Sequence, residues 1–437
     1  MSPLLTSFAG ISIYPLGFTR GALRANCFMI KAVSSATQTQ GWTISGTSDG
    51  SIFIGGSDIY YSPYRTYVAK INKDYSTAWI YGDSNSTGSE NVYNLKTNAS
   101  GGYLFTDWAK NQSSWPAVFV GNADGTQVWT RQLQNSGAGF GFANYGASNE
   151  IYFSTTDNGN NNNSSLKRTV VAKYNSSGTI QWQRYIDGGQ TYQASIGADA
   201  STSTGNIVKA YAPSSSTGGS GWPSITKLNS SGTLQWTSAW PVGYIAYQRG
   251  DNLKMDASEN VYWLGGDLSA NLYIYKLNSS GVEQWKRNYN LTGVNPGAIT
   301  VDGSGNVYVL GYTSSALYVI KYNSSGTIQW QRSMSISGQS LTTRDASIHA
   351  IGGTISFAGY TTRAYYFRMP DDGTLTGAYN FNGETITWAA VSGTDITATT
   401  QSFASATHTV AASSATEAAN SGSLTSGSLT ITNRTIP

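Results

Sequence analysis

Few residues of this chain have the chemistry of a catalytic group. Its histidines are His349 and His408, and its single cysteine is Cys27, so no disulfide can form within the chain. The sequence contains no HExxH zinc motif, no GxSxG nucleophile motif and no phosphate-binding P-loop. His349 stands where Asp256 and Asp302 precede turns in other parts of the chain, so we expect it to be a turn residue. These residues predict a protein that is not an enzyme and has no metal site or cofactor.

The carboxylates suggest two further kinds of site. Asp199, Asp256 and Asp302 each precede a turn rich in Ser, Gly and Asn, where a carboxylate can bind calcium or close an Asx-turn. One carboxylate per turn favours the Asx-turn. Glycoside hydrolysis needs two carboxylates about 5–10 Å apart. The sequence alone cannot pair the carboxylates in or near loops, which are Asp83, Asp107, Asp187, Asp251 and Asp267.

A long repeat gives the elements that must position these groups. The segment KYNSSGTIQWQR occurs at residues 173–184 and again, unchanged, at residues 321–332. Weaker copies recur along the chain, and each follows a second motif whose clearest form is DGSGNVYVLGYT at residues 302–313. A seventh copy at residues 366–375 lacks the tryptophan. The period of about 50 residues is typical of propeller blades. It is marked by Trp79, Trp129, Trp182, Trp236, Trp285 and Trp330.

Each repeat is predicted to form four short antiparallel strands, A to D. Alternating stretches such as VYVLGYT and TIQWQR predict strands, and Ser-Gly-Asn and Asn-Ser-Ser-Gly predict the tight turns between them. The motif pair GNVYVxGYT and KxNxxGxxxW resembles the seven-bladed β-propeller repeats of bacterial and bacteriophage proteins. More distantly, it is similar to the tryptophan-docked blades of quinoprotein dehydrogenases. The resemblance covers residues 38–382 and implies an all-β fold: a seven-bladed β-propeller of four-stranded antiparallel blades.

The regular side chains of the repeat are predicted to be structural. A tryptophan at the same position of every strand D is expected to pack one blade against the next. Arginines two residues further on share its strand face, which favours a cation–π or inter-blade contact; they are Arg131, Arg184, Arg287 and Arg332. The strand-C lysines are expected to be solvated; they are Lys70, Lys173, Lys227, Lys276 and Lys321.

Two segments lie outside the predicted propeller. Residues 1–37 form an N-terminal extension, and residues 383–437 form a tail rich in Ala, Ser, Thr and Gly. Alternating runs in the tail suggest strands, which could form a small β appendage or pair with a neighbouring subunit; a flexible tail is the competing interpretation. Two segments, residues 375–381 and residues 26–31, could supply the last strand of the seventh blade.

The irregular part of the repeat is the connection between strands B and C. It is minimal in blades 6 and 7 but long in blades 1 to 4, so four adjacent blades are expected to raise one side of one face. Irregular loops on a regular scaffold usually carry function. Aromatic rings beside Asn, Ser and Asp suit sugars or protein partners, although they could only hold their own loops in place. The D–A connections are expected to emerge on the same face. The candidate ligand-binding residues are Tyr60, Tyr61, Tyr64, Trp108, Trp115 and Trp222 in the B–C connections, and Tyr244 in a D–A connection.

Composition narrows the class of protein. Charged residues make up only 11% of the chain, the net charge is +3 and no basic run is present, which disfavours binding to nucleic acid. We expect no signal peptide, and no apolar run is long enough for membrane insertion. The sequence is also rich in Gly, Ser, Thr and Asn, in which it resembles bacteriophage structural proteins. Together these features favour a bacteriophage virion protein that is not an enzyme.

In this interpretation a tail, fibre or capsid-surface protein binds a host-surface glycan or protein receptor through the long-loop face. Its terminal extensions would contact other virion proteins. Two alternatives stay open: a bacterial extracellular propeller lectin, and a propeller enzyme. The enzyme would be a polysaccharide hydrolase or lyase, or a quinoprotein.

Overall fold

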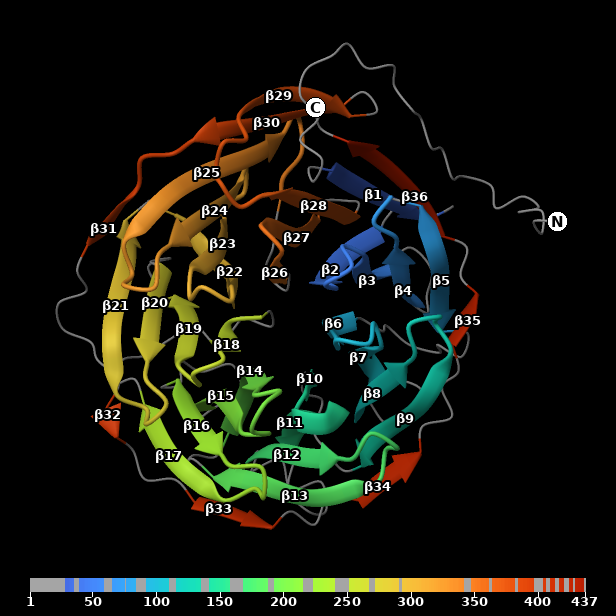
Figure 1. The fold of residues 1–437 in the computed structure, drawn as a ribbon, viewed down its shortest axis with the longest axis vertical. Helices are drawn as coiled ribbons and strands as arrows, with labels where there is room; N and C mark the ends of the chain where they lie inside the picture. Colours follow the sequence, from blue (N-terminus) through green and yellow to red (C-terminus); the bar gives the residue numbers. More distant parts are fainter. Residues whose placement is uncertain are drawn as a thin grey trace.

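Seven β-sheets stand in a ring around a common axis in the computed structural model (Figure 1). Each sheet is antiparallel, and its first four positions are filled by the strands that the repeat predicts. The predicted all-β, seven-bladed propeller is therefore confirmed. The structure describes residues 28–34, 39–58, 65–74, 76–83, 92–109, 115–134, 141–157, 168–187, 192–214, 223–239, 251–266, 272–290, 293–341, 347–360, 364–381, 384–396, 404–405, 409–412, 416–419, 424–426 and 429–435.

Blades 1 to 4 follow one another along the chain, each running from the strand nearest the axis to the rim. Blade 1 comprises β2 (Thr39–Gly46), β3 (Ile52–Asp58), β4 (Arg65–Ile71) and β5 (Thr77–Asp83). Blade 2 comprises β6 (Val92–Thr97), β7 (Tyr103–Ala109), β8 (Trp115–Gly121) and β9 (Gln127–Gln134). Blade 3 comprises β10 (Phe142–Tyr145), β11 (Ile151–Asp157), β12 (Arg168–Tyr174) and β13 (Ile180–Asp187), with a short 3-10 helix at Ala147–Asn149. Blade 4 comprises β14 (Tyr192–Ala200), β15 (Ile207–Ser214), β16 (Ser224–Leu228) and β17 (Leu234–Ala239).

Blades 5 to 7 complete the ring. Blade 5 comprises β18 (Leu253–Met255), β19 (Val261–Gly266), β20 (Leu272–Leu277) and β21 (Glu283–Asn290). Blade 6 comprises β22 (Asn295–Val301), β23 (Val307–Tyr312), β24 (Leu317–Tyr322) and β25 (Ile328–Ile336). Blade 7 comprises β26 (Ile348–Ile351), β27 (Thr354–Tyr360), β28 (Ala364–Pro370) and β1 (Phe28–Ser34).

The N-terminal strand β1 closes the ring. It pairs with β28 from Phe28 opposite Arg368 to Ala32 opposite Ala364. Strand D of blade 7 is therefore supplied by the second of the two candidate segments. The other candidate contributes β29 (Gly377–Phe381), which pairs with β30 on the rim of blade 6. Blade 7 therefore combines β1, from the N-terminal part of the chain, with three strands from the end of the repeat region. The pairing of β1 with β28 closes the ring.

The repeat motif joins successive blades. In blade 3, the Trp182 indole N–H and the Lys173 ammonium both donate to the backbone carbonyl of Ser230, in the C–D turn of blade 4, at 3.0 Å each. Arg184 donates from Nε to the Gly232 carbonyl of the same turn, and its guanidinium lies 5.4 Å from the Trp182 ring centre. Gly232 has φ of +78°, which a glycine adopts without strain.

The same contact recurs around most of the ring. Each strand-D tryptophan from blade 1 to blade 6 donates to a carbonyl in the next C–D turn, and these carbonyls belong to Ala123, Ser176, Ser230, Ser279, Ser324 and Asp371. A strand-C lysine reaches the same carbonyl in blades 1, 3, 4, 5 and 6. The prediction of contacts between blades is therefore confirmed for the tryptophans, and for Arg131, Arg184 and Arg287, which donate to the Gly178, Gly232 and Gly326 carbonyls. Arg332 donates instead to the Gln331 carbonyl of its own strand.

The expectation of solvated strand-C lysines is wrong. Lys173 and Lys227 are buried, and Lys227 also forms an ion pair with Glu259 at 2.5 Å. A solvated lysine would have left the turn carbonyl of the next blade with one donor instead of two. These lysines therefore belong to the contact between blades.

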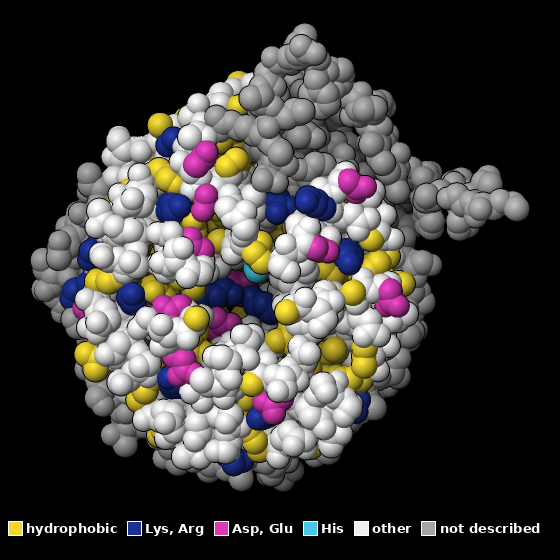
Figure 2. Space-filling model, in the orientation of Figure 1, with side chains coloured by type: hydrophobic (Ala, Val, Ile, Leu, Met, Phe, Trp, Pro, Cys, Tyr) yellow, Lys and Arg dark blue, Asp and Glu magenta, His cyan; other side chains and the backbone are white. Residues whose placement is uncertain are grey.

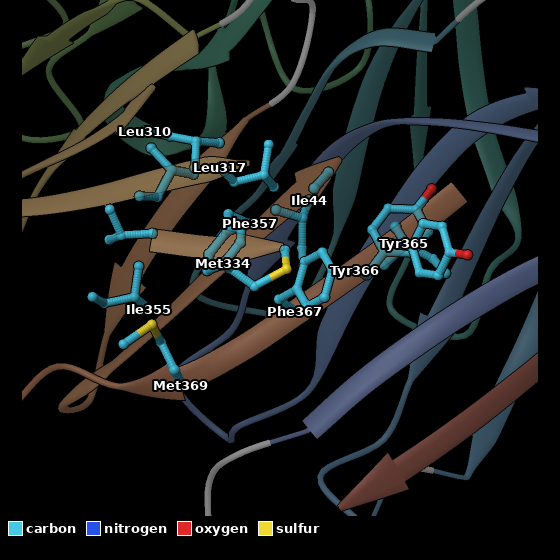
Figure 3. Close-up of a cluster of buried hydrophobic side chains, with 14 of the residues drawn as sticks. Ile44, Leu310, Leu317, Met334, Ile355, Phe357, Tyr365, Tyr366, Phe367 and Met369 are labelled. Carbon is cyan, nitrogen blue, oxygen red and sulfur yellow. The ribbon is translucent and has the colours of Figure 1, made fainter. Parts of the chain in front are cut away.

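A large core cluster fills the interfaces among blades 6, 7 and 1. Figure 3 shows Met334 of β25 beside Phe357 and Phe367 of blade 7. The rings of Phe357 and Trp388 meet edge to face at 6.0 Å between centroids. Trp388 belongs to the C-terminal tail, so the tail contributes directly to this core.

The tail forms a strap around the outside of the ring. Its strands add one strand to each blade, in the order of blades 6, 5, 4, 3, 2, 1 and 7 (Figure 1). The expected strands are therefore present, but they pair with this chain's own blades. The strap comprises β30 (Glu384–Ala390), β31 (Thr394–Ile396), β32 (Ala404–Ser405), β33 (Thr409–Ala412), β34 (Thr416–Ala419), β35 (Leu424–Ser426) and β36 (Leu429–Thr435).

Candidate functional site

The connections between strands B and C differ in length from blade to blade. They span residues 59–64, 110–114, 158–167, 215–223, 267–271, 313–316 and 361–363 in blades 1 to 7. The longest two are therefore in the adjacent blades 3 and 4. The C–D turns contrast with them, because the Asn-Ser-Ser-Gly turns share one hydrogen-bonding pattern: the Asn175, Asn229 and Asn323 side chains each accept two backbone N–H bonds.

Only part of the predicted aromatic site falls on described residues. Trp108 and Trp115 are strand residues, not loop residues: they lie at the ends of β7 and β8 that adjoin residues 110–114. In the register, Trp108 is opposite Pro116 and Ala109 is opposite Trp115, so pairing continues further than the sequence indicates. The other candidates, Tyr60, Tyr61, Tyr64, Trp222 and Tyr244, lie outside the described residues. Ligand binding by this set stays a prediction.

A second candidate site lies at the ring axis and was not predicted. In every innermost strand, the residue before the last one lies at the same position relative to the neighbouring strand. These residues are Ser45, Lys96, Asn144, Asp199, Lys254, Thr300 and Ala350. We call Lys96, Asp199, Asp251, Lys254 and His349 the axial cluster. Figure 2 shows basic, acidic and histidine side chains gathered at the middle of the face in view.

An ion pair joins opposite sides of the ring. Lys96 Nζ of β6 lies 2.6 Å from Asp251 Oδ1, just before β18, and Lys254 Nζ lies 3.6 Å from the same oxygen. Figure 1 places β6 and β18 across the axis from each other. Asp199 accepts the Met255 N–H at 2.8 Å, which joins blade 4 to blade 5. The cluster therefore links blades 2, 4 and 5 at the centre.

Burial and charge act in opposite directions within the axial cluster. Burial lowers the pKa of Lys96 to about 8, although Asp251 partly offsets it. Burial alone would raise the pKa of Asp251, but Lys254 and Lys96 outweigh it and hold that pKa below its ordinary value. Burial raises the pKa of Asp199. The cluster thus contains one ammonium whose pKa is lowered and one carboxyl whose pKa is raised.

His349 is part of this cluster, and the expectation that it is a turn residue is wrong. It lies within the innermost strand β26, opposite Ser356. The A–B turn of blade 7 comes later, at Gly352 and Gly353, whose positive φ values of +59° and +75° suit glycine. Burial, followed by the nearby Lys254 and Lys96, lowers the pKa of His349 to about 3. The imidazole is therefore neutral at physiological pH.

Two side chains, His349 of the cluster and the neighbouring Asn252, have spare hydrogen-bonding capacity. Asn252 is fully buried, and neither its amide oxygen nor its amide nitrogen has a hydrogen-bond partner among the described residues. The same holds for His349 Nε2. Such buried atoms usually bond to water or to a ligand. The cluster can thus offer donors and acceptors to a small polar group.

The carboxylates that precede the A–B turns do not all behave alike. Asp256 and Asp302 each accept two backbone N–H bonds through Oδ1 and an asparagine side chain plus a tyrosine hydroxyl through Oδ2. The preferred Asx-turn interpretation is therefore confirmed for these two. Asp199 instead accepts the backbone N–H of Met255 in the next blade. Among the described residues, no three His, Cys, Asp or Glu side chains are grouped to hold a metal ion.

Comparisons with known proteins bear on the fold. A family model described as a beta-propeller repeat matches residues 289–318, which run from the end of β21 into β24. No curated protein matches the sequence. One similar solved structure is the Dos1 propeller, with 10% identity, a TM-score of 0.44, and coverage of 82% of this chain and 94% of that chain. Another is the polysaccharide lyase Uly1, with 8% identity, a TM-score of 0.49, and coverage of 78% and 98% respectively.

The geometry and the family match agree on the class of protein. The chain is a seven-bladed β-propeller that contains a beta-propeller repeat. Both solved structures are too dissimilar to carry any argument about function. In the described residues, no helix has the length and apolar character that crossing a bilayer requires.

Proposed function

We propose that this propeller is a non-enzymatic adhesion protein on a bacteriophage particle, in a tail, a fibre or the capsid surface. Its ligand is a glycan or protein receptor on the host surface, and its binding site is the face that carries the B–C connections. It uses no cofactor, binds no nucleic acid, does not insert into a membrane, and contacts other virion proteins through its terminal segments.

The observation that carries this proposal is the contrast between the two kinds of connection. The C–D turns are short, repeat one hydrogen-bonding pattern and are engaged by the neighbouring blade. The B–C connections vary from residues 361–363 in blade 7 to residues 158–167 in blade 3. The D–A connections vary as well, from residues 188–191 to residues 240–252. Variable connections beside uniform C–D turns mark the surface where a rigid scaffold presents binding residues.

The construction of the rim supports a role outside the cell. Both ends of the described chain, β1 and β36, lie in the same blade, and the strap adds a strand to all seven blades. A ring closed in this way has few free strand edges from which unfolding or aggregation could begin. Such persistence suits a particle that must survive between hosts.

A glycan array and a host-cell binding assay test the proposal. Replacing residues 158–167 by the four-residue connection of residues 313–316 should abolish binding and leave the thermal midpoint unchanged. Trp222→Ala, in the connection of blade 4, should weaken binding. The matched control is Ser231→Ala in the exposed C–D turn of the same blade, which should bind normally. Normal binding by both connection variants would contradict the loop-face assignment.

A polysaccharide-cleaving enzyme is the second candidate function, and the axial cluster favours it. Perturbed pKa values beside unpartnered polar atoms are common at active sites. This alternative predicts release of soluble product from a bound polysaccharide, and loss of that release in Asp199→Asn. Binding without product would leave adhesion as the function, whereas an extracellular lectin would bind glycan without being part of a particle.

A further inference from the structure

The fourth strand of each of blades 1 to 6 has two different halves. In β13, the register with β12 shifts between Lys173 and Tyr174, which leaves an extra residue in the half of β13 that precedes Trp182. The strap strand β33 pairs only with the other half, from Arg184 to Asp187. A bulge prevents a further strand from pairing regularly, whereas a regular half is an open template. The strap thus covers the half that could accept a strand.

The same division occurs in every bulged blade. Register shifts of this kind are present in the C–D hairpins of blades 1 to 6. In each of these blades the strap pairs after the tryptophan, beginning at Tyr81, Arg131, Arg184, Ser238, Asn288 and Arg332. In blades 1 to 6 the strap therefore pairs with the regular half of the fourth strand, beyond the bulge.

Blade 7 has no such bulge, and its strap pairing is longer. Its outer strand β1 pairs with β28 without a register shift, so its whole length could accept another strand. Its strap strand β36 pairs with all of β1, from Phe28 opposite Thr435 to Ser34 opposite Leu429. Where the bulge is missing, the cover is complete.

In its described residues, the strap is anchored at both ends and makes shorter pairings between them. At one end, β30 buries Ile386 and Trp388 in the core, and Gln331 exchanges two hydrogen bonds with the Gly393 backbone at 2.7 and 3.0 Å. At the other end, β36 makes the seven-residue pairing with β1. Between them, β32 pairs with only Ser238 and Ala239. Such short pairings open at low free-energy cost.

We propose that the strap is a removable cover over strand edges, and that a chain whose strap is displaced pairs through those edges with a second copy of itself. The partner is a second copy because each uncovered edge is the regular half of an outer strand, and another copy offers the same kind of edge. Antiparallel pairing of two such edges would replace the hydrogen bonds that the strap supplies.

A single glycine allows the strap to be loosened in the full-length chain. A Cβ atom added at Gly393 would lie only 2.3 Å from the Tyr289 hydroxyl oxygen, so either the strap or the buried Tyr289 ring must shift. Because Tyr289 itself donates to Gln331, either shift disturbs the contact between Gln331 and the strap. Gly393→Ala should therefore increase the hydrogen exchange of β31 and produce dimers or larger species as the protein concentration rises. The matched control is Gly303→Ala, because an added Cβ there meets nothing within 4 Å.

A second variant removes most of the cover. A protease site inserted between β31 and β32 allows the folded chain to be cut, and an identical site between β11 and β12 is the control. After cutting, size-exclusion chromatography with light scattering should show loss of the tail fragment and self-association, but only for the strap site. Retention of the tail by the cut chain, or a monomer after the tail is lost, would overturn the proposal. So would a Gly393→Ala protein that behaves like Gly303→Ala.

Discussion

Two kinds of blade interface differ in how they are built. Between blades 3 and 4, the lysine and tryptophan of one repeat share a carbonyl of the next, and the interfaces after blades 4, 5 and 6 use the same contact. Between blades 7 and 1, Arg368 occupies the lysine position and donates to the Gly50 carbonyl, in an A–B turn. The repeated contacts therefore join each blade to the next but do not by themselves close the ring. Closure of the ring depends on β1, the strap and the contacts of blade 7.

Removal of the strap's aromatic anchor, which packs blade 6 against the closing blade 7, should have the largest effect on stability. Trp388→Ala deletes a ring that is 2% exposed and packs against Phe357 and Phe367. The cavity should cost about 3–5 kcal/mol of unfolding free energy. Denaturant unfolding monitored by fluorescence measures it, and a loss below about 1 kcal/mol would mean that the strap does not stabilise the closing blade.

Loss of one repeated contact should cost somewhat less. Trp182 is only partly buried, so Trp182→Ala should lower the unfolding free energy by about 2–3 kcal/mol through lost packing and the lost bond to Ser230. Binding through the loop face should persist at temperatures where the variant remains folded. A variant that keeps its stability but loses its ligand would mean that the repeat tryptophan is a binding residue.

The polar part of the closing interface should contribute a smaller amount. The Tyr366 hydroxyl donates to the Gly55 carbonyl at 2.9 Å and lies 2.7 Å from the Tyr67 hydroxyl, and all of these groups are buried. Tyr366→Phe leaves both partners without that bond, which should cost about 1–3 kcal/mol. The thermal midpoint compared with wild type is the measurement, and an unchanged midpoint would contradict this account of the interface.

The axial cluster should give stability a dependence on pH. Because the pKa of Lys96 is lowered to about 8 in the folded chain, the unfolded chain holds a proton that the folded chain has lost between about pH 8 and 10.5. Stability should therefore rise with pH across that window, by up to about 1.4 kcal/mol per pH unit. Lys96→Met should remove this contribution. Unfolding curves that show equal slopes for both proteins would contradict the assignment.

The smallest effect should come from replacing a half-buried copy of the strand-C lysine, in comparison with a buried copy. Lys227 is buried and ion-paired with Glu259, whereas Lys276 makes one exposed bond to the Ser324 carbonyl at 3.3 Å. Lys276→Met should change the unfolding free energy by less than about 0.5 kcal/mol. Lys227→Met leaves the Glu259 carboxylate without its cation and should cost more. Equal effects in thermal unfolding would mean that burial does not distinguish the two copies.

The sequence predicts what is repeated and misses what depends on distant partners. The period, the turns and the tryptophan contacts follow from local patterns that recur in each blade. The strap was only suggested by alternating runs, because which edge a strand joins depends on bulges in other strands. The axial cluster was missed because Lys96 and Asp251 are 155 positions apart and lie on short innermost strands whose pattern is weak. The buried lysines were missed because their acceptors belong to the next blade.

The difference between the two kinds of interface can be measured most directly by hydrogen exchange on the strap-cut chain. After the cut between β31 and β32 and removal of the tail, amides of β27 and β28 in blade 7 should lose protection, because β1 loses β36. Amides of β11 and β12 in blade 3 should keep theirs, because the tryptophan and lysine contacts remain. Equal loss in both blades, or no loss in blade 7, would contradict the conclusion that the repeat joins the blades while β1 and the strap close the ring.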